Sequence, residues 1–190
     1  MKRQGSFYFD LVVGIVVLLV LGITGIAGVH GVYDRYLHMR YPLTNAGDIF
    51  RCYEEYNLDP SFVSAVIYEE SRFNPAAHSG ANALGLMQIV PETGKYLAGK
   101  MGHSSFDPQV LRQTGTNIAY GCYYLSLLSA KYQEQDKVLA AYNAGPGTVD
   151  QWLAEGDYAV KFKETEQFVA RVTRSEGVYR SLYFPEIPQK

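Results

Sequence analysis

The pattern of apolar and polar positions divides the chain into an apolar N-terminal segment and a region of helical periodicity. Residues 11–29 contain no charged side chain. From residue 46 onward, apolar residues recur at intervals of three and four, and no stretch alternates with period two. Gly, Asn and Ser cluster in residues 72–88, which predicts a loop. The pattern as a whole predicts an all-α domain over residues 46–185. Its clearest helices are expected over 61–73, 114–132, 136–144, 147–154 and 164–183.

Capping residues and prolines indicate where the helices begin. Thr44 is suited to cap a helix that runs through Asn57. Asp59 and Pro60 combine an N-cap residue with a proline at the first helical position, which is a strong start signal. Two further starts are predicted at Pro91 and at Asp107-Pro108.

The uncharged stretch 11–29 is as long as a helix that crosses a bilayer, which needs ~20 apolar residues. Two basic residues precede it, and such charge keeps the preceding residues, 1–10, in the cytoplasm. We therefore predict a single transmembrane anchor, a tether over residues 30–45 and an extracytoplasmic domain. A cleaved signal peptide is the alternative, because the small residues Gly25 and Ala27 are compatible with a cleavage site.

Length and charge narrow the classes of function. A chain of 190 residues fits one globular domain with a short additional segment. The formal net charge is −2, and no long run of Lys or Arg is present. This composition argues against a surface that neutralises nucleic-acid phosphates, so we expect no nucleic-acid partner. An uncharged polymer is the more natural ligand.

Few other chemical signatures are present. The four histidines are scattered and lack the spacing of a zinc hydrolase. The chain contains no Gly-x-Ser-x-Gly motif and no glycine-rich phosphate loop, so neither a metal nor a cofactor is expected. The two cysteines, Cys52 and Cys122, are compatible with a disulfide in an exported domain and equally with two buried thiols.

One carboxylate has an unusual position on the predicted helix 61–73. At about 100° per residue, one side of this helix is apolar. That side is formed by Phe62, Val63, Val66, Ile67 and Phe73. Glu70 lies near its middle, whereas Glu69 lies toward its edge. Desolvation raises the pKa of a carboxyl group, so Glu70 is a candidate general acid. The alternative is that Glu70 reaches solvent at the end of the helix.

Four separated motifs follow one another along the chain. The first comprises Glu70, Ser71, Phe73, Pro75, Ser79, residues 85–89 and Pro91. The second comprises Asn117, Ile118, Gly121, Tyr124 and Leu125, and the third spans residues 140–147. The fourth comprises Glu164, Thr165, Phe168 and Val169. In order and spacing these motifs, between residues 48 and 183, resemble the catalytic domain of the lytic transglycosylases, glycoside hydrolase family 23.

This resemblance implies a lysozyme-like helical domain whose groove binds peptidoglycan, the polymer of alternating N-acetylglucosamine and N-acetylmuramic acid. It implies that Glu70 protonates the glycosidic oxygen and then acts as a base. The C6 hydroxyl of the muramic acid would attack C1 and give a 1,6-anhydro product without water. One carboxylate suffices when the nucleophile is tethered in the substrate. A hydrolytic muramidase and a non-catalytic wall-binding scaffold remain the alternatives.

The same resemblance implies further substrate-binding residues. Ser79 and Gln88 are expected beside the acid, and Gln88 offers both donors and acceptors. The Tyr142 hydroxyl is expected near Glu70. The other expected contacts are Ser71, which alternatively braces the end of the helix, Met87, which alternatively is core, Asn143 and Glu164. Gly85 is expected to let the backbone approach the sugar.

The chain departs from the family pattern at two places. Glu166 and Phe168 stand where the family commonly has Arg and Tyr, which weakens the assignment of Glu164. Asn82 stands in a loop where glycine is common. Because asparagine tolerates left-handed backbone angles, we expect this loop to be kept.

Overall fold

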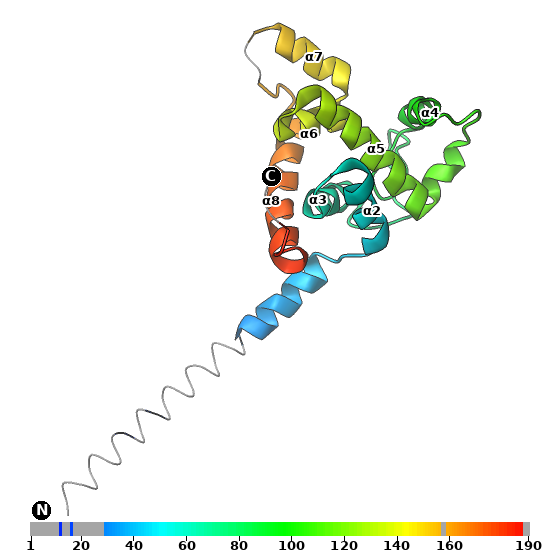
Figure 1. Cartoon of the computed structure of the whole chain (residues 1–190). Helices are drawn as coiled ribbons and strands as arrows, with labels where there is room; N and C mark the ends of the chain where they lie inside the picture. Colours follow the sequence, from blue (N-terminus) through cyan, green and yellow to red (C-terminus); the bar gives the residue numbers. More distant parts are fainter. Residues whose placement is uncertain (1–11, 13–15, 17–28, 157–158, 188–190) are drawn as a thin grey trace, which may run out of the picture. The chain divides into compact units, whose positions relative to one another are not determined.

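The computed structural model describes Val12, Val16 and residues 29–156 and 159–187 (Figure 1). The chain divides into two units, Met1–Arg40 and Tyr41–Lys190. In the first unit, residues 29–40 are helical. The second unit contains α2 (Ala46–Tyr56), α3 (Pro60–Ser71), α4 (Pro91–Lys100), the 3-10 helix η1 (Pro108–Arg112), α5 (Thr114–Tyr132), α6 (Gln135–Ala144), α7 (Pro146–Ala154) and α8 (Lys163–Tyr183).

The predicted all-α class is confirmed, because the described residues form helices and no named strand. Helix α5 has the predicted bounds, and α6, α7 and α8 each begin one residue earlier than predicted. The helix predicted over 61–73 ends earlier, at Ser71, because Arg72 adopts a left-handed conformation with φ of 54°. Two isolated bridges, His78 with Leu84 and Leu84 with Ile89, fold the loop that follows.

The predicted membrane-spanning segment, residues 11–29, lies outside the described residues apart from Val12, Val16 and Val29. In the parts of the chain that the structure describes, none of the helices combines the length and apolar character needed to cross a bilayer.

The cap predictions have mixed outcomes. Asp59 caps α3 as predicted, because its carboxylate accepts a hydrogen bond from the Ser61 amide at 2.8 Å. Helix α4 begins at Pro91 as predicted. The prediction for Thr44 was wrong: the N-cap of α2 is Asn45, which has φ of 58° and makes no side-chain cap bond. Local sequence placed the start of α2 within one residue but selected the wrong cap.

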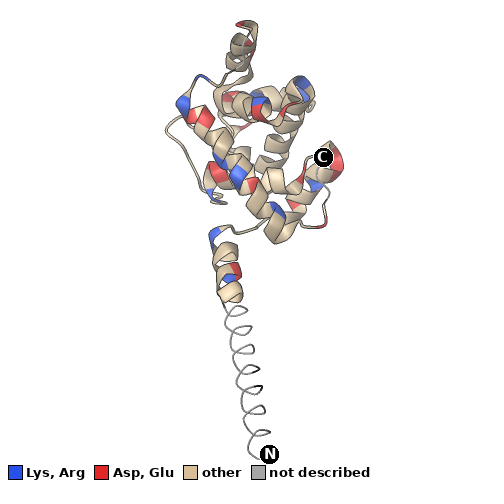
Figure 2. Ribbon diagram, turned by 90° about the vertical axis from the view of Figure 1, so that its left-hand side faces the viewer, with Lys and Arg blue, Asp and Glu red and all other residues tan. Residues whose placement is uncertain are grey.

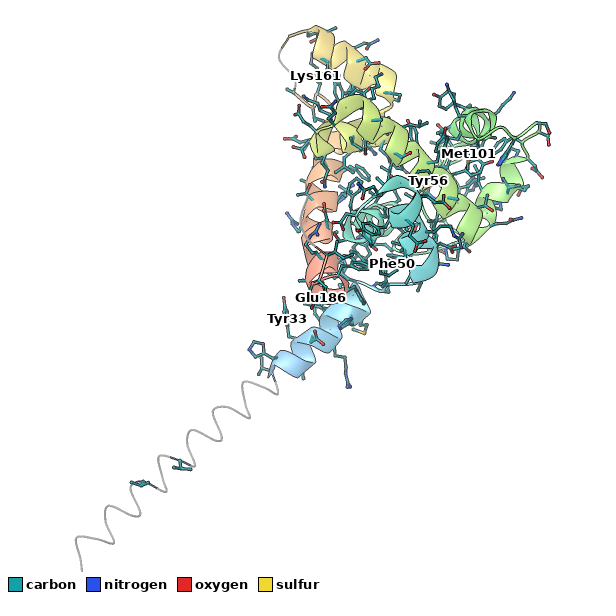
Figure 3. The ribbon with its side chains drawn as sticks, viewed as in Figure 1. Tyr33, Phe50, Tyr56, Met101, Lys161 and Glu186 are labelled. Atoms are coloured by element: carbon teal, nitrogen blue, oxygen red, sulfur yellow. A yellow bond between two sulfur atoms is a disulfide. The ribbon has the colours of Figure 1, made fainter. Side chains whose placement is uncertain are left out.

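Helix α3 is the central helix of the second unit. It packs against α8 and α2, and Figure 1 shows it between α8 on one side and α2 and α5 on the other. Its first nine residues, 60–68, are all buried. The sequence predicted burial on one side of this helix only, so the buried surface is larger than predicted. A helix that is buried on every side belongs to the interior. Figure 3 shows side chains filling the space around it.

A disulfide between Cys52 and Cys122 joins α2 to α5. The two Cα atoms lie 5.8 Å apart, although 70 residues separate them in sequence. The structure thus decides between the two states that the sequence left open.

Charged residues hold the outer faces of the helices together. In the view of Figure 2, segments with Lys or Arg and segments with Asp or Glu are interspersed among uncharged ones. Arg180 of α8 lies 2.9 Å from Asp59 at the start of α3 and 3.0 Å from Glu176. This contact joins α8 to the start of α3.

Candidate active site

A cleft of about 460 Å³ opens beside the C-terminal end of α3. Six separate parts of the chain contribute to it: the end of α3, the loop between α3 and α4, the start of α4, the middle of α5, the end of α6 and the start of α8. The cleft brings together six of the predicted site residues. These are Glu70, Ser79, Gln88, Tyr142, Asn143 and Glu164.

Glu70 is half-buried where α3 meets the cleft. Burial raises the pKa of its carboxyl group from 4.5 to about 8, because the charged form loses solvation. The positive charge of Arg171 opposes this increase, and the charge of Glu69 adds to it. Glu70 therefore holds its proton at neutral pH, which is the state that a general acid requires.

The neighbouring Glu69 has the opposite environment. Its side chain is only 4% exposed and points to α8, where Ser175 donates a hydrogen bond to it at 2.6 Å. Arg72 forms a bidentate pair with it at 3.0 and 3.1 Å, and Arg171 lies 3.3 Å away. The sequence placed Glu69 at the edge of the apolar face but gave no sign of these partners. Glu69 joins α3 to α8 and does not line the cleft.

Asn117 organises the loop that carries the cleft residues. It is fully buried on α5, and its amide accepts from the Met87 backbone N–H at 2.7 Å. It also donates to the carbonyl groups of Leu84 and Leu111, both at 2.8 Å. The sequence analysis placed Asn117 in the second motif but assigned it no role. Three bonds to backbone groups explain why an amide is needed at this position.

Gly85 is required by the packing of the loop against α5. Its φ is +75°, and a Cβ atom here would lie 2.5 Å from the Asn117 amide nitrogen and 2.6 Å from the Leu111 carbonyl oxygen. The glycine therefore makes room for Asn117, and the expected close approach of the backbone to a sugar stays a prediction. Asn82 adopts φ of 61°, as expected for asparagine in this loop.

Two predicted substrate contacts lie outside the cleft lining. The Met87 side chain is fully buried against Gly121, in the core rather than in the cleft lining. Ser71 donates its hydroxyl to the Ile67 carbonyl at 3.1 Å and braces the end of α3. Adjacency in a motif placed both residues correctly along the chain, but the direction of each side chain depends on packing.

Gln88 turns the loop into the cleft. Its φ is 47°, a conformation that non-glycine residues rarely adopt. Its side-chain amide donates to the Gly85 carbonyl at 2.8 Å, which holds the turn. The carbonyl oxygen of the same amide is left to accept from a ligand.

Tyr142 connects the loop to the acid. Its hydroxyl donates to the Met87 carbonyl at 2.7 Å, and its ring lies 5.4 Å from that of Tyr124. Burial raises the pKa of Tyr142, and the charge of Glu70 raises it further. Because the only hydroxyl proton is donated to Met87, the oxygen lone pairs remain as acceptors near the Glu70 carboxyl group.

Asn143 at the end of α6 and Glu164 at the start of α8 also line the cleft. The Asn143 amide oxygen accepts from the hydroxyl of buried Thr165 at 2.8 Å, which leaves its two amide N–H donors for a ligand. Glu164 is exposed in the first turn of α8. Within the described residues, no group of three or more His, Cys, Asp or Glu could hold a metal ion.

The cleft joins one protonated carboxyl group to hydroxyl and amide groups on an all-helical scaffold. Such a site is typical of an enzyme that uses a general acid on a ligand rich in hydroxyl and N-acetyl groups. The chain belongs to the family of the Transglycosylase SLT domain, whose family model matches residues 49–165.

Two relatives are similar to this chain in sequence. The chain is 34% identical over 164 residues to a putative soluble lytic murein transglycosylase of Haemophilus influenzae, covering 81% of this chain and 28% of the relative. It is 32% identical over 139 residues to a membrane-bound lytic murein transglycosylase C of Haemophilus ducreyi, covering 68% of this chain and 36% of the relative. The chain thus spans about a third or less of these proteins.

A solved structure supports the same relationship. It is that of an inactive glutamate-to-glutamine mutant of the lytic transglycosylase Slt from Pseudomonas aeruginosa, at 32% identity and with a TM-score of 0.70. The match covers 79% of this chain and 26% of that one.

Proposed function

We propose that this protein is a peptidoglycan lytic transglycosylase that cleaves the bond between N-acetylmuramic acid and N-acetylglucosamine without water. Membership of the family and the names of its relatives support this function. The observation that carries the proposal is the half-buried Glu70, whose pKa of about 8 keeps it protonated in a cleft of hydroxyl and amide groups. The lysozyme-like fold implied by the motifs is consistent with the all-helical domain.

In the proposed reaction, Glu70 gives its proton to the glycosidic oxygen while the bond from that oxygen to C1 breaks. The Glu70 carboxylate then takes a proton from the C6 hydroxyl of the muramic acid, whose oxygen bonds to C1. Glu70 ends the cycle protonated, and no water is consumed. The tethered hydroxyl benefits from a high effective concentration, so a second carboxylate is not required.

The other cleft residues are proposed to bind the glycan. Ser79, Gln88 and Asn143 present hydroxyl and amide groups that suit the hydroxyl and N-acetyl groups of a sugar. Tyr142 is proposed to orient the carboxyl group of Glu70 through its free lone pairs. Glu164 is proposed to contact the substrate from the rim. Met87 and Ser71 act behind the site rather than in it.

A hydrolytic muramidase is the competing function, because Glu164 places a second carboxylate in the cleft. Classical glycosidases use two carboxylates, one of which activates water or attacks C1. Glu164 is exposed, whereas the partner of a buried acid in such enzymes is held close to the bond that breaks. The two functions differ in their products.

Product analysis tests the proposal. Purified peptidoglycan is digested with the full-length protein, and the fragments are separated and weighed by mass spectrometry. We expect 1,6-anhydro ends, and we expect the Glu70→Gln variant to lose at least about three orders of magnitude in rate, the loss typical of a removed catalytic group. Reducing ends would identify a muramidase instead. Unchanged activity in Glu70→Gln would remove Glu70 from the mechanism.

We further propose that residues 11–29 anchor the protein in the membrane, with residues 1–10 in the cytoplasm and the domain outside. The disulfide between Cys52 and Cys122 supports an oxidising compartment for the domain. One relative is named a membrane-bound enzyme. Alkaline extraction of cell membranes and protease treatment of spheroplasts test this topology. Release of the full-length chain into the soluble fraction, or protection of the domain, would contradict it.

A further inference from the structure

Two glutamates that are adjacent in sequence face different surroundings at the end of α3. Glu70 lines the cleft, whereas the Glu69 side chain is only 4% exposed and lies toward α8. A carboxylate that is withdrawn from water needs partners to stay charged. Glu69 has three such partners, two guanidinium groups and one hydroxyl group. They are Arg72, Arg171 and Ser175.

The two carboxylate oxygens of Glu69 are shared among these partners. Oε1 accepts from Ser175 at 2.6 Å and from Arg72 at 3.1 Å. Oε2 lies 3.0 Å from Arg72 and 3.3 Å from Nε of Arg171. Arg72 is held a second time, because its guanidinium group lies 4.0 Å from the centre of the Tyr68 ring. Glu69 therefore matters most for Arg171, whose guanidinium group it fixes at the contact between α3 and α8.

The charge of Arg171 acts on both glutamates. It lowers the pKa of the Glu70 carboxyl group, against the larger effect of burial, and the charge of Glu69 raises that pKa. Among the residues that the structure describes, Arg171 is the cation whose charge acts on Glu70. Its side chain is 43% exposed, so burial does not hold it in one direction. A general acid beside an unpaired guanidinium group releases its proton more readily.

The other titratable groups around the acid do not compete with this cation. Tyr142 of α6 and Tyr124 of α5 line the same cleft as Glu70. Burial raises the pKa of Tyr142 well above 10 and that of Tyr124 to about 12, so both hydroxyl groups stay neutral where Glu70 titrates. Glu164 is exposed, and water screens its charge. On the other side of α3, Tyr179 of α8 faces the neighbouring carboxylate, and burial also raises its pKa.

We infer that Glu69 is a positioning residue, which holds the Arg171 guanidinium group at α8 and prevents it from pairing with the general acid Glu70. The inference rests on the proposed function, because it takes Glu70 as the acid. Glu69 lies outside the cleft lining, so it acts through Arg171 and does not contact the glycan. A link between α3 and α8 does not by itself require Glu69, because Asp59 and Arg180 already form one at the start of α3.

The pH dependence of glycan cleavage tests the inference. Initial rates of the full-length protein are measured on purified peptidoglycan at low substrate concentration, between about pH 5 and 10, so that the profile reports the free enzyme. The wild-type rate should fall above about pH 8, where Glu70 loses its proton. We expect Glu69→Gln to move this fall about one pH unit lower, as for a carboxyl group that gains a cationic neighbour.

Two further variants give the opposite and the compensated result. Arg171→Gln removes the cation and leaves the Glu69 charge, so the fall in rate should move to higher pH. The double variant Glu69→Gln with Arg171→Gln removes the cation and its partner together, and its profile should return close to that of the wild type. Glu69→Asp keeps the charge on a shorter side chain, so its profile should lie nearer to the wild type than that of Glu69→Gln.

Asp59→Asn is the matched control for a purely structural effect. It breaks the ion pair with Arg180 that joins the same two helices at the other end of α3. This variant should lose stability, because the Asp59 carboxylate also caps α3. Its fall in rate should nevertheless stay at the wild-type pH, since neither charge lies beside Glu70.

The possible results separate the inference from the function on which it rests. A lower rate of Glu69→Gln at every pH, with the fall at the wild-type pH, makes Glu69 a structural link and overturns the inference but not the function. An equal displacement in Asp59→Asn also overturns it. If Glu69→Gln does not fold, Arg171→Gln decides, because a fall in rate that does not move to higher pH overturns the inference. If the wild-type protein cleaves no peptidoglycan at any pH, the proposed function fails and the inference fails with it.

Discussion

Replacing Glu70 with glutamine should make the protein more stable at alkaline pH. The folded protein raises the pKa of this carboxyl group from 4.5 to about 8. Between these two pH values the unfolded chain releases the proton and the folded protein keeps it. The wild-type protein therefore has this group's full stability below pH 4.5 and loses stability as the pH rises to about 8. Glutamine stays neutral at every pH, so the variant does not lose stability in this pH range.

The magnitude follows from the difference of roughly 3.5 pH units between the two states, at about 1.36 kcal/mol per unit. The upper bound is about 5 kcal/mol at pH 8 and above. Because water reaches part of the half-buried carboxyl group and lowers the penalty, we expect a gain of about 2–3 kcal/mol at pH 8. Near pH 4.5 the gain should nearly vanish.

Urea unfolding at pH 4.5, 6 and 8 measures this gain. Trp152, the single tryptophan, is buried and reports unfolding by fluorescence. Glu69→Gln is the matched control, because it removes a carboxylate that pairs with Arg72 and Arg171 and should lower the midpoint at pH 8. A Glu70→Gln variant that is no more stable than wild type at pH 8, or whose gain is the same at all three pH values, would refute the reasoning.

Three further predictions concern activity and the supports of the site. The rate of glycan cleavage should fall about tenfold per pH unit above pH 8 as Glu70 loses its proton, and a flat profile up to pH 10 would contradict its role as the acid. Reduction of the disulfide between Cys52 and Cys122, which closes a loop of 70 residues, should lower the free energy of unfolding by about 4 kcal/mol, and an unchanged urea midpoint would count against this. Asn117→Ala should cost about 3–5 kcal/mol, because it leaves three buried backbone groups without their partner; calorimetric unfolding checks this, and a loss below about 1 kcal/mol would not fit.

The positions of the helices were largely predictable, because the signals that define them are local. Helix α5 has the predicted bounds, and Asp59 caps α3 through a contact two residues away. Periodicity and capping depend on neighbours within about one turn. Thr44 shows the limit of such signals, since the chain caps α2 one residue later. The predicted anchor, residues 11–29, remains a prediction.

The candidate acid could also be identified from the sequence. The structural roles of the other motif residues could not. Motifs identified Glu70 together with the five cleft residues that accompany it. The same motifs included Met87, which packs against Gly121 in the core, and Gly85, which makes room for Asn117. A motif records which residues occur together, whereas the direction of a side chain is set by what surrounds it.

The sequence by itself determined the all-helical class, most helix bounds and the identity of the acidic residue that faces the cleft. Only the tertiary structure decided that Glu69 pairs with Ser175, which lies 106 residues away, and that Cys52 pairs with Cys122. It also decided that six separate parts of the chain form the cleft. The reason is physical: helix formation depends on residues within a turn, but desolvation, pairing and cavities arise where distant segments pack together.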